Sequence, residues 1–196
     1  MRIIRRAAFT TVPWKNGGGV THEALRVPAG AVHHQFRISV AEIDASGPFS
    51  DFTGYRRHMV LLQGAGLRLR FSNGARAALQ RVGDLVEFDG GLHTECDLLA
   101  GACVDLNLLT SQAIESADAR VERLTRPLVL AADAAATFAV FCICGSVCVV
   151  QGAGDAAALD RWDLAVFDGA AGSVQLQSAA DRSGETAVFL AKLALP

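Results

Sequence analysis

The stretch Gly83-Asp-Leu-Val-Glu-Phe-Asp-Gly90 returns later in the chain as Trp162-Asp-Leu-Ala-Val-Phe-Asp-Gly169. Five of the eight positions are identical, and the two copies are 79 residues apart. Two further pairs of segments resemble each other in the same order: 60–64 with 141–145, and 104–109 with 188–193. Three matches in register favour an internal duplication. Similar turn chemistry in two β-rich halves is the alternative explanation.

Around these segments, apolar and polar residues alternate with the period of a β-strand. Phe36, Ile38 and Val40 alternate with polar or small residues, and residues 67–71 show the same pattern before an Asn-Gly turn. Turn signals recur about every ten residues, and a repeating β-unit of about 80 residues is typical of a jelly-roll. We therefore predict an all-β, cupin-like (jelly-roll) double barrel formed by two related halves.

We expect the N-terminal half to span residues 1–125, including a glycine-rich segment and a connector. The C-terminal half then spans 126–196 and packs with it as one bicupin unit. Within the connector, residues 110–119 are the one segment whose pattern predicts a helix, with Ser111 as its N-cap.

Composition narrows the class of protein. Hydrophobic residues make up 51% and charged residues 19% of the 196 residues, so a folded core is expected. The net charge of −2 argues against a nucleic-acid partner, and no apolar run is long enough for a membrane-spanning helix. Five cysteines without framework spacing fit a reducing, cytoplasmic location.

The histidines and cysteines do not predict a metal site or another cofactor. His33 and His34 are adjacent, so on a strand they would point to opposite faces and could not chelate together. Cys142, Cys144 and Cys148 on one strand would spread too far for a tetrahedral site. We expect surface histidines and core cysteines. No catalytic nucleophile motif is present either.

Residues 13–23 form the most unusual segment, because three consecutive glycines follow Trp14, Lys15 and Asn16. The lysine precedes the glycines, whereas a phosphate loop needs it after them. Two interpretations remain open. The glycines could let a strand cross the mouth of a barrel, or the three residues before them could form part of a binding site there.

Two polar pairs alternate with apolar residues on separate strands. Arg37 with Ser39, and Asp105 with Asn107, each share one face of a strand. They could face solvent, or together with Arg57 they could line a lumen that binds a carboxylate. Asp105 would then orient an arginine, and Glu23 or Glu42 are further acidic candidates, either for the site or as a partner of Arg37.

The loop at residues 47–57 is a candidate cover for such a site. Phe49 and Phe52 could equally form a hydrophobic plug.

Several strings in this part of the chain resemble the HutD/Ves family. They are Trp14-Lys-Asn-Gly-Gly-Gly-x-Thr21-x-Glu23, Arg37-Ile-Ser39-x-Ala-Glu42, Gly47-Pro-Phe-Ser-x-Phe52-x-Gly54-x-x-Arg57 and Asp105-x-Asn107. The resemblance implies a duplicated cupin-like barrel. It also implies, for the HutD branch, an association with histidine utilisation and binding of an intermediate such as urocanate or formylglutamate. Leu106 departs from the family pattern, and the branch, HutD or Ves, stays open.

Motifs and resemblance together give ten candidate ligand-binding residues: Trp14, Lys15, Asn16, Thr21, Glu23, Arg37, Ser39, Arg57, Asp105 and Asn107. We expect a non-catalytic, carboxylate-binding or regulatory protein without a metal. A metal-independent isomerase or hydrolase, with Glu23, Glu42 or Asp105 as base, is the first alternative. A structural or interaction module is the second, and a homodimer stays an option.

Overall fold

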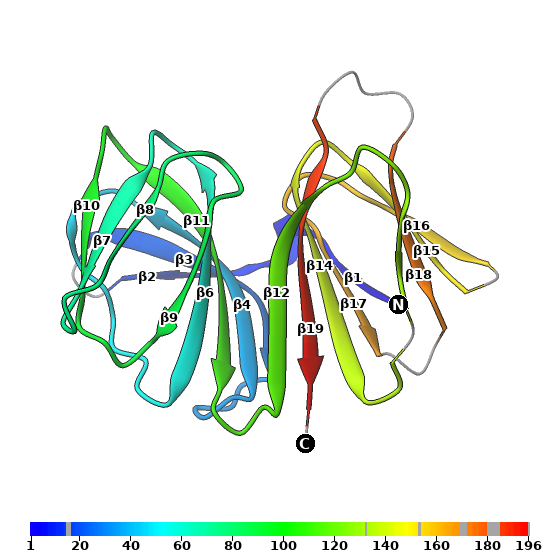
Figure 1. Cartoon of the computed structure of the whole chain (residues 1–196), viewed down its shortest axis with the longest axis horizontal. Helices are drawn as coiled ribbons and strands as arrows, with labels where there is room; N and C mark the ends of the chain where they lie inside the picture. Colours follow the sequence, from blue (N-terminus) through cyan, green and yellow to red (C-terminus); the bar gives the residue numbers. More distant parts are fainter. Residues whose placement is uncertain (15–16, 132, 153, 169–171, 180–184, 196) are drawn as a thin grey trace. The chain divides into compact units, whose positions relative to one another are not determined.

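Antiparallel β-strands make up nearly all of the regular secondary structure, as Figure 1 shows for the computed structural model. The structure describes residues 1–196 except 15–16, 132, 153, 169–171, 180–184 and 196. Contacts divide the chain into two units. We call residues 9–113 the first barrel, and residues 1–8 together with 114–196 the second barrel.

The first barrel consists of a six-stranded and a four-stranded sheet. In spatial order, the larger sheet contains β2 (Thr10–Pro13), β3 (Gly19–Val27), β4 (Phe36–Ile43), β11 (Cys103–Ser111), β6 (Tyr55–Gln63) and β9 (Leu85–Asp89). The smaller sheet contains β5 (Gly47–Pro48), β10 (Thr94–Leu98), β7 (Leu67–Phe71) and β8 (Arg76–Leu79).

The second barrel consists of a five-stranded and a four-stranded sheet. The larger contains β1 (Arg2–Ile4), β17 (Leu164–Asp168), β14 (Ala136–Cys144), β19 (Ala187–Ala194) and β12 (Ser116–Arg123). The smaller contains β13 (Leu128–Leu130), β18 (Val174–Ser178), β15 (Val147–Gln151) and β16 (Asp155–Leu159). A short 3-10 helix, η1 (Arg6–Ala8), follows β1.

The expected all-β fold of two related halves is confirmed by the strand orders. The order β4-β11-β6-β9 in the first barrel corresponds to β12-β19-β14-β17 in the second, and β5-β10-β7-β8 corresponds to β13-β18-β15-β16. Even the irregularity in the ladder recurs, between Val104 and Asp105 in one copy and between Cys142 and Cys144 in the other. The chain therefore contains one β-unit twice.

The pairing also corrects the register of one repeated segment. Val104 lies opposite Gln63, one residue before Gly64, and Ala187 lies opposite Cys144, one residue before Gly145. Val104 therefore corresponds to Ala187 rather than Val188. The two strands share a general apolar pattern, and such a pattern does not distinguish neighbouring registers as the ladder does.

Gly64 and Gly145 show why the duplicated turns keep glycine. Their φ angles are +108° and +74°, where side chains are strained. A Cβ at Gly64 would lie 2.6 Å from Sγ of Cys103, and one at Gly145 would lie 2.5 Å from Oγ1 of Thr186. Both the backbone angle and the close approach of the facing strand exclude a larger residue.

The predicted helix over residues 110–119 is wrong. β11 continues to Ser111, and β12 begins at Ser116 and pairs along its whole length with β19. The partner residues lie 64 to 78 residues further along the chain (Arg123 pairs with Ala187, and Ser116 with Ala194), so local capping signals carry no information about them.

The division between the units also differs from the expected boundary after residue 125. Residues 114–125 belong to the second barrel through β12, and so do residues 1–8. Arg2 to Ile4 pair with β17, and the guanidinium of Arg5 donates to Asp163 at 2.7 Å. Strand pairing between distant segments decides membership of each barrel.

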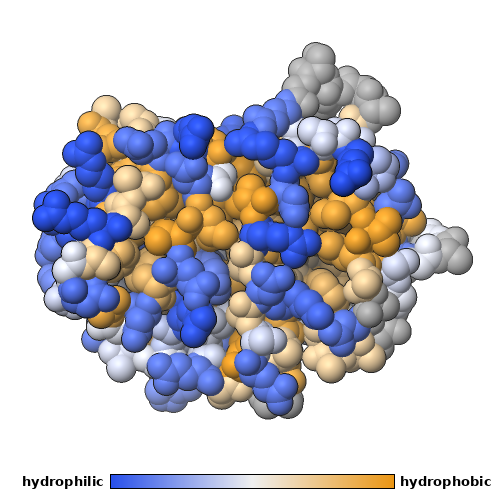
Figure 2. Space-filling model, in the orientation of Figure 1, coloured by the Kyte–Doolittle hydropathy of each residue, from blue (hydrophilic) through white to orange (hydrophobic). Residues whose placement is uncertain are grey.

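Each unit has a largely apolar interior. In the first barrel, side chains such as Met59, Leu61, Leu67 and Leu69 from both sheets form one buried cluster. On the face drawn in Figure 2, hydrophilic side chains are spread over both units. Within the described residues, no helix is long and apolar enough to cross a membrane.

Candidate functional site

A small cavity in the first barrel lies over its six-stranded sheet and beneath the segment that follows β5. We call it the arginine cavity. Its volume of about 40 Å³ is room for about three water molecules, at 10–15 Å³ each. The residues that line it are Trp14, Thr21, Arg37, Ser39, Ala41, Phe49, Ser50, Phe52, Arg57, Asn107 and Leu109.

Strand register explains why these side chains meet. Arg37 on β4 lies opposite Leu109 on β11, which in turn lies opposite Arg57 on β6. Two residues along, Ser39 lies opposite Asn107. Side chains at such paired positions share one face of the sheet. The polar face of β4 and β11 is therefore the face that lines the cavity.

Arg57 is held by a buried chain of hydrogen bonds. Its Nε donates to Oδ1 of Asn107 at 2.8 Å, and Nδ2 of Asn107 donates to Oδ2 of Asp105 at 2.9 Å. The terminal nitrogen of Arg57 lies 3.9 Å from the same carboxylate oxygen. Asp105 itself does not line the cavity and acts from behind Asn107.

Burial shifts the pKa values of this pair toward their neutral forms. Burial lowers the pKa of Arg57 to about 10, although the nearby Asp105 opposes the shift. Burial raises the pKa of Asp105 to about 6, again opposed by its partner Arg57. At neutral pH Arg57 therefore stays charged, and Asp105 lies close to its titration range.

Aromatic rings lie close to both guanidinium groups. Cζ of Arg57 lies 4.6 Å from the ring centre of Phe49, 5.5 Å from Phe88 and 5.9 Å from Phe52. Cζ of Arg37 lies 5.1 Å from the ring of Phe52. Such distances are those of cation–π contacts. Phe49 and Phe52 both line the cavity, and Phe49 also packs against the buried apolar cluster of the first barrel.

The glycine-rich segment brings Trp14 to the cavity. Nε1 of Trp14 donates to Oγ1 of Thr21 at 2.8 Å. A Cβ at Gly19 would overlap the carbonyl oxygen of Glu42 and lie 3.2 Å from the Trp14 ring. This glycine therefore permits the close approach of β3 and β4. Lys15 and Asn16, two of the predicted site residues, lie outside the described residues.

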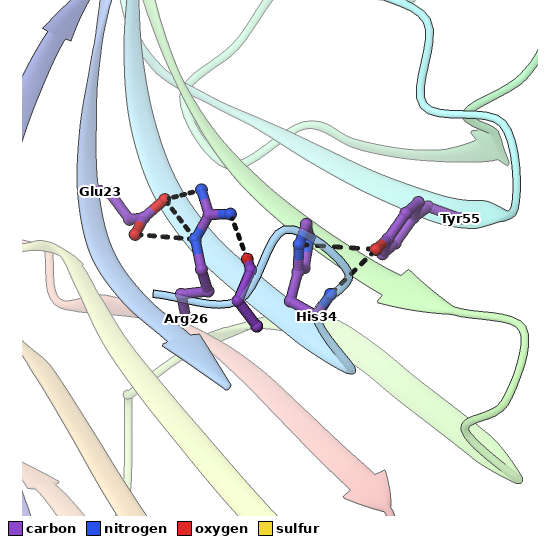
Figure 3. Close-up of polar contacts among 5 residues, drawn as sticks. Glu23, Arg26, His34 and Tyr55 are labelled. Atoms are coloured by element: carbon purple, nitrogen blue, oxygen red, sulfur yellow. Dashed lines mark hydrogen bonds and ion pairs between the residues drawn. The ribbon is translucent and has the colours of Figure 1, made fainter. Parts of the chain in front are cut away.

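Glu23 lies outside the lining of the cavity, unlike six of the other predicted residues (Trp14, Thr21, Arg37, Ser39, Arg57 and Asn107). Its carboxylate accepts from Nη2 of Arg26 at 2.6 Å and from Nε at 3.1 Å, and Nη1 of Arg26 donates to the carbonyl of Ala31 at 2.9 Å (Figure 3). This hydrogen bonding lowers the pKa of Glu23. Arg26, and not Arg37, is its partner.

A hydroxyl–imidazole–carboxylate chain lies on the other face of the same sheet. Oγ1 of Thr11 is 2.8 Å from Nδ1 of His22, and Nε2 of His22 is 2.8 Å from Oε1 of Glu42. His22 lies opposite Val40, whereas Thr21 and Ala41 line the cavity. Adjacent strand residues point to opposite faces, so this chain does not serve the cavity.

The expected surface histidines are partly wrong, because His34 and His58 are only 6% and 2% exposed. His33 and His34 lie in the loop before β4 rather than on a strand. His34 packs on Tyr55 with ring centres 4.5 Å apart. No local pattern distinguishes this buried loop histidine. Among the described residues, no three His, Cys, Asp or Glu side chains gather as a metal site requires.

In the second barrel the corresponding positions are apolar. The registers match Arg57 with Phe138, Asp105 with Val188, and Asn107 with Leu190. All three replacements are buried. The duplicated fold therefore forms without a charged pair at these positions.

Relatives with similar sequences match a little over half of the chain. A protein of Pseudomonas putida described as an uncharacterized 21.2 kDa protein in the hutC 3' region is 38% identical over 110 residues, which are 56% of this chain and 57% of that protein. Protein Ves of Citrobacter koseri is 32% identical over 55% of this chain and 56% of that protein. The chain thus spans somewhat more than half the length of these curated relatives.

Solved structures match over nearly the whole chain. A conserved protein of Pseudomonas aeruginosa PAO1 has a TM-score of 0.86 and 29% identity, covering 100% of this chain and 98% of that one. HutD from Pseudomonas fluorescens SBW25 has a TM-score of 0.79 and 28% identity, covering 98% of both. Oxalate decarboxylase of Lactobacillus farciminis has a TM-score of 0.69 at 11% identity and covers 99% of this chain and 86% of that one. This likeness shows the fold alone, which is cupin-like.

The family model described as HutD matches residues 6–188, which include the whole first barrel, most of the second and every predicted site residue. The chain belongs to the HutD family.

Proposed function

We propose that this chain is a non-catalytic binding protein for a small carboxylate, held in the arginine cavity, with a regulatory role in histidine utilisation. The ligand would be an intermediate such as urocanate or formylglutamate. Five free cysteines fit a cytoplasmic location for this role.

The contrast between the two barrels carries the proposal. Burying an ion pair is costly, and well-packed apolar residues often replace such a pair without loss of stability. In the second barrel the equivalent positions are occupied by the buried apolar residues Phe138, Val188 and Leu190. Retaining Arg57, Asp105 and Asn107 in the first barrel therefore favours a role in binding over a role in folding.

The chemistry of the lining suits an anion. Arg37 and Arg57 both border the space, and only one buried carboxylate, that of Asp105, lies within 4 Å of a guanidinium there, as far as the described residues go. Hydroxyls of Thr21, Ser39 and Ser50 add neutral hydrogen-bond donors. A carboxylate accepts several such bonds, and charge-assisted bonds to arginine are among the strongest in proteins.

Two facts about the relatives support this proposal. One is named for its position in the hutC 3' region, which links the family to a histidine-utilisation locus. The structure of HutD from P. fluorescens is described in a formate condition. Formate is therefore a sensible first probe for this chain.

A ligand panel tests the proposal directly. Thermal denaturation with formate, acetate, urocanate, formylglutamate, glutamate and histidine would be followed by calorimetric titration of any that bind. A ligand at 100 times its Kd raises the midpoint by about 5–10 °C for a chain of this size. If none of the acids shifts the midpoint, the proposed function is wrong.

Two adjacent arginines supply a matched control. Arg57→Gln removes the buried guanidinium, whereas Arg56→Gln removes an exposed one on the opposite face of β6. We expect the first change to abolish binding and the second to leave it intact.

The near-neutral pKa of Asp105 supports a second function, a metal-independent enzyme in which this carboxylate acts as base. Its place behind Asn107 favours binding instead. Chromatography of the same ligand mixtures after prolonged incubation distinguishes the two, because an enzyme would leave product that the Asp105→Asn variant does not.

A further inference from the structure

A pocket of about 200 Å³ lies in the second barrel, and we call it the second-barrel pocket. Six of its lining residues come from β12, β19 and β14, which are neighbours in the five-stranded sheet (Figure 1). The other three are residues 129–131, at the end of β13 and just after it. The complete lining is Arg120, Val129, Leu130, Ala131, Phe138, Ala139, Leu190, Ala191 and Lys192.

The duplication places this pocket at the position of the arginine cavity. Four of its lining residues have counterparts that line the cavity: Phe138 corresponds to Arg57, Leu190 to Asn107, Lys192 to Leu109 and Arg120 to Ser39. The strand β13 corresponds to β5, and the cavity lies beneath the segment that follows β5. The two spaces therefore occupy the same part of the duplicated unit, and the second is about five times larger.

Apolar side chains form most of the wall of the second-barrel pocket. Leu130, Phe138 and Leu190 belong to the buried apolar cluster of this unit. Val129 is instead 60% exposed, so the pocket also has apolar surface in contact with water. A ligand that removes such surface from water gains free energy. An apolar cavity of about 150 Å³ can bind benzene, so the space here is enough for one ring and a small substituent.

The charged groups beside the pocket are already paired. Nε of Arg120 donates to Oε1 of Glu122 at 2.8 Å, and its Nη1 donates to Oδ2 of Asp118 at 3.4 Å. Nζ of Lys192 lies 2.7 Å from Oδ2 of Asp133, and this hydrogen bond lowers the pKa of Asp133. Three carboxylates thus accompany two cations. An anionic ligand would add a fourth negative charge, whereas an uncharged ligand leaves the ion pairs in place.

The same cations favour an aromatic ligand over a saturated one. A cation is attracted to the face of an aromatic ring even where its charge is partly balanced, because the ring carries a negative quadrupole there. Nζ of Lys192 already lies 5.9 Å from the ring centre of Phe138, which is within the range of such contacts. A ring in the pocket would border Arg120 and Lys192 and could pack against Phe138.

We propose that the second-barrel pocket is a second binding site and takes an uncharged aromatic molecule of one ring. The duplicated unit then binds a different class of molecule in each copy, because the buried charged pair of one copy is replaced by apolar residues in the other. The inference concerns a separate site and does not rest on the proposed function.

Three small molecules of similar size test the inference in NMR titrations of the isotope-labelled chain. Phenol is aromatic and uncharged, cyclohexanol is saturated and uncharged, and benzoate is aromatic and anionic. We expect phenol to shift the amide signals of residues 129–131, 138–139 and 190–192. Cyclohexanol should bind about three- to fivefold more weakly, without the ring contacts. Benzoate should bind at this pocket about tenfold more weakly than phenol, because of the added negative charge.

Two exposed valines supply a matched pair of variants. Val129→Asp places a carboxylate on the wall, where it would lose water when a ring binds, so the affinity for phenol should fall about tenfold. Val12 is 54% exposed on β2 of the first barrel, and Val12→Asp should leave that affinity unchanged. Phe138→Leu keeps an apolar wall without the ring and should remove the preference for phenol over cyclohexanol.

Each outcome decides one part of the inference. If phenol at millimolar concentration causes no shifts, or shifts only residues away from the pocket, the site is wrong. Cyclohexanol or benzoate binding there as tightly as phenol would overturn the ligand class. Because both valines are exposed, their variants decide the location even if Phe138→Leu does not fold, and equal affinities of these two variants for phenol would overturn it. Binding of formate in the first barrel is measured separately, so either proposal can fail without the other.

Discussion

Arg57 and Phe138 occupy the same position in the two copies of the duplicated unit. Arg57 lies opposite Leu109 on β11, and Phe138 lies opposite Lys192 on β19, at the same distance from the irregularity in each ladder. One copy therefore contains a buried cation where the other contains an aromatic ring. The second barrel can therefore serve as an internal reference for the first. Placing its apolar residues in the first barrel gives variants whose side chains already occur at equivalent positions of the same fold.

The first prediction concerns a variant in which the three buried polar residues of the first barrel are replaced by their apolar counterparts from the second. The triple variant Arg57→Phe, Asp105→Val, Asn107→Leu should fold, with a free energy of unfolding between unchanged and about 4 kcal/mol higher, because no buried charge remains. It should no longer bind formate. Denaturant unfolding and calorimetry measure the two properties. A triple variant that unfolds would show that the polar network is needed for the fold.

The second prediction concerns the single change Asn107→Leu. It leaves Nε of Arg57 and Oδ2 of Asp105 without their hydrogen bonds to this amide. We expect a loss of about 2–4 kcal/mol in the free energy of unfolding, from two buried polar groups left unpaired. The single variant should thus be less stable than the triple variant. Additive effects of the three changes in denaturant unfolding would contradict the network.

The third prediction is that formate binds more tightly as the pH falls from 7.5 to 5. Burial raises the pKa of Asp105 to about 6, so the carboxylate becomes neutral in this range and no longer opposes an anion at Arg57. The gain should be about tenfold, as expected for a like charge removed a few ångströms away. A bound anion should in turn raise the pKa of Asp105 further.

Two variants check that assignment. Asp105→Asn should make the affinity independent of pH, since Arg57 stays charged throughout. Asp97→Asn removes an exposed carboxylate paired with Arg70 and should keep the dependence. The pKa of His34 is also lowered, so a dependence that survives Asp105→Asn would assign the titration to His34 instead.

The fourth prediction compares two glycines with positive φ. Gly64→Ala should cost about 2–4 kcal/mol, from backbone strain and from overlap with Cys103. Gly74→Ala has the same kind of φ angle but open space around it, so it should cost about 1 kcal/mol. Thermal denaturation of both variants gives the comparison. Equal losses would mean that the backbone angle alone matters.

Much of the architecture could be predicted from local patterns. Alternation such as Leu67, Leu69 and Phe71 against Arg68 and Arg70 follows from the geometry of a strand with one buried face, and the structure places the leucines inside and the arginines outside. The repeat around Gly83 and Trp162 indicated two related halves for a similar reason, since turns need particular residues at particular positions.

Such local patterns could not predict which distant segments pair with each other. The partner of β12 is β19, and the partner of β1 is β17, so the expected helix at 110–119 and the expected boundary after 125 both differ from the structure. Nothing within residues 110–125 specifies which strand will satisfy their backbone hydrogen bonds.

The sequence by itself determined the β-rich class, the duplication and the polar residue types of the first half, because these follow from periodicity and composition. Only the tertiary structure decided which of those residues share a cavity. The ladder across β4, β11 and β6 brings Arg37, Arg57 and Asn107 onto one face, and Glu23 pairs with Arg26 instead. The tertiary structure also packs the loop residue His34 against Tyr55. Register is a property of two strands together, so no single segment contains it.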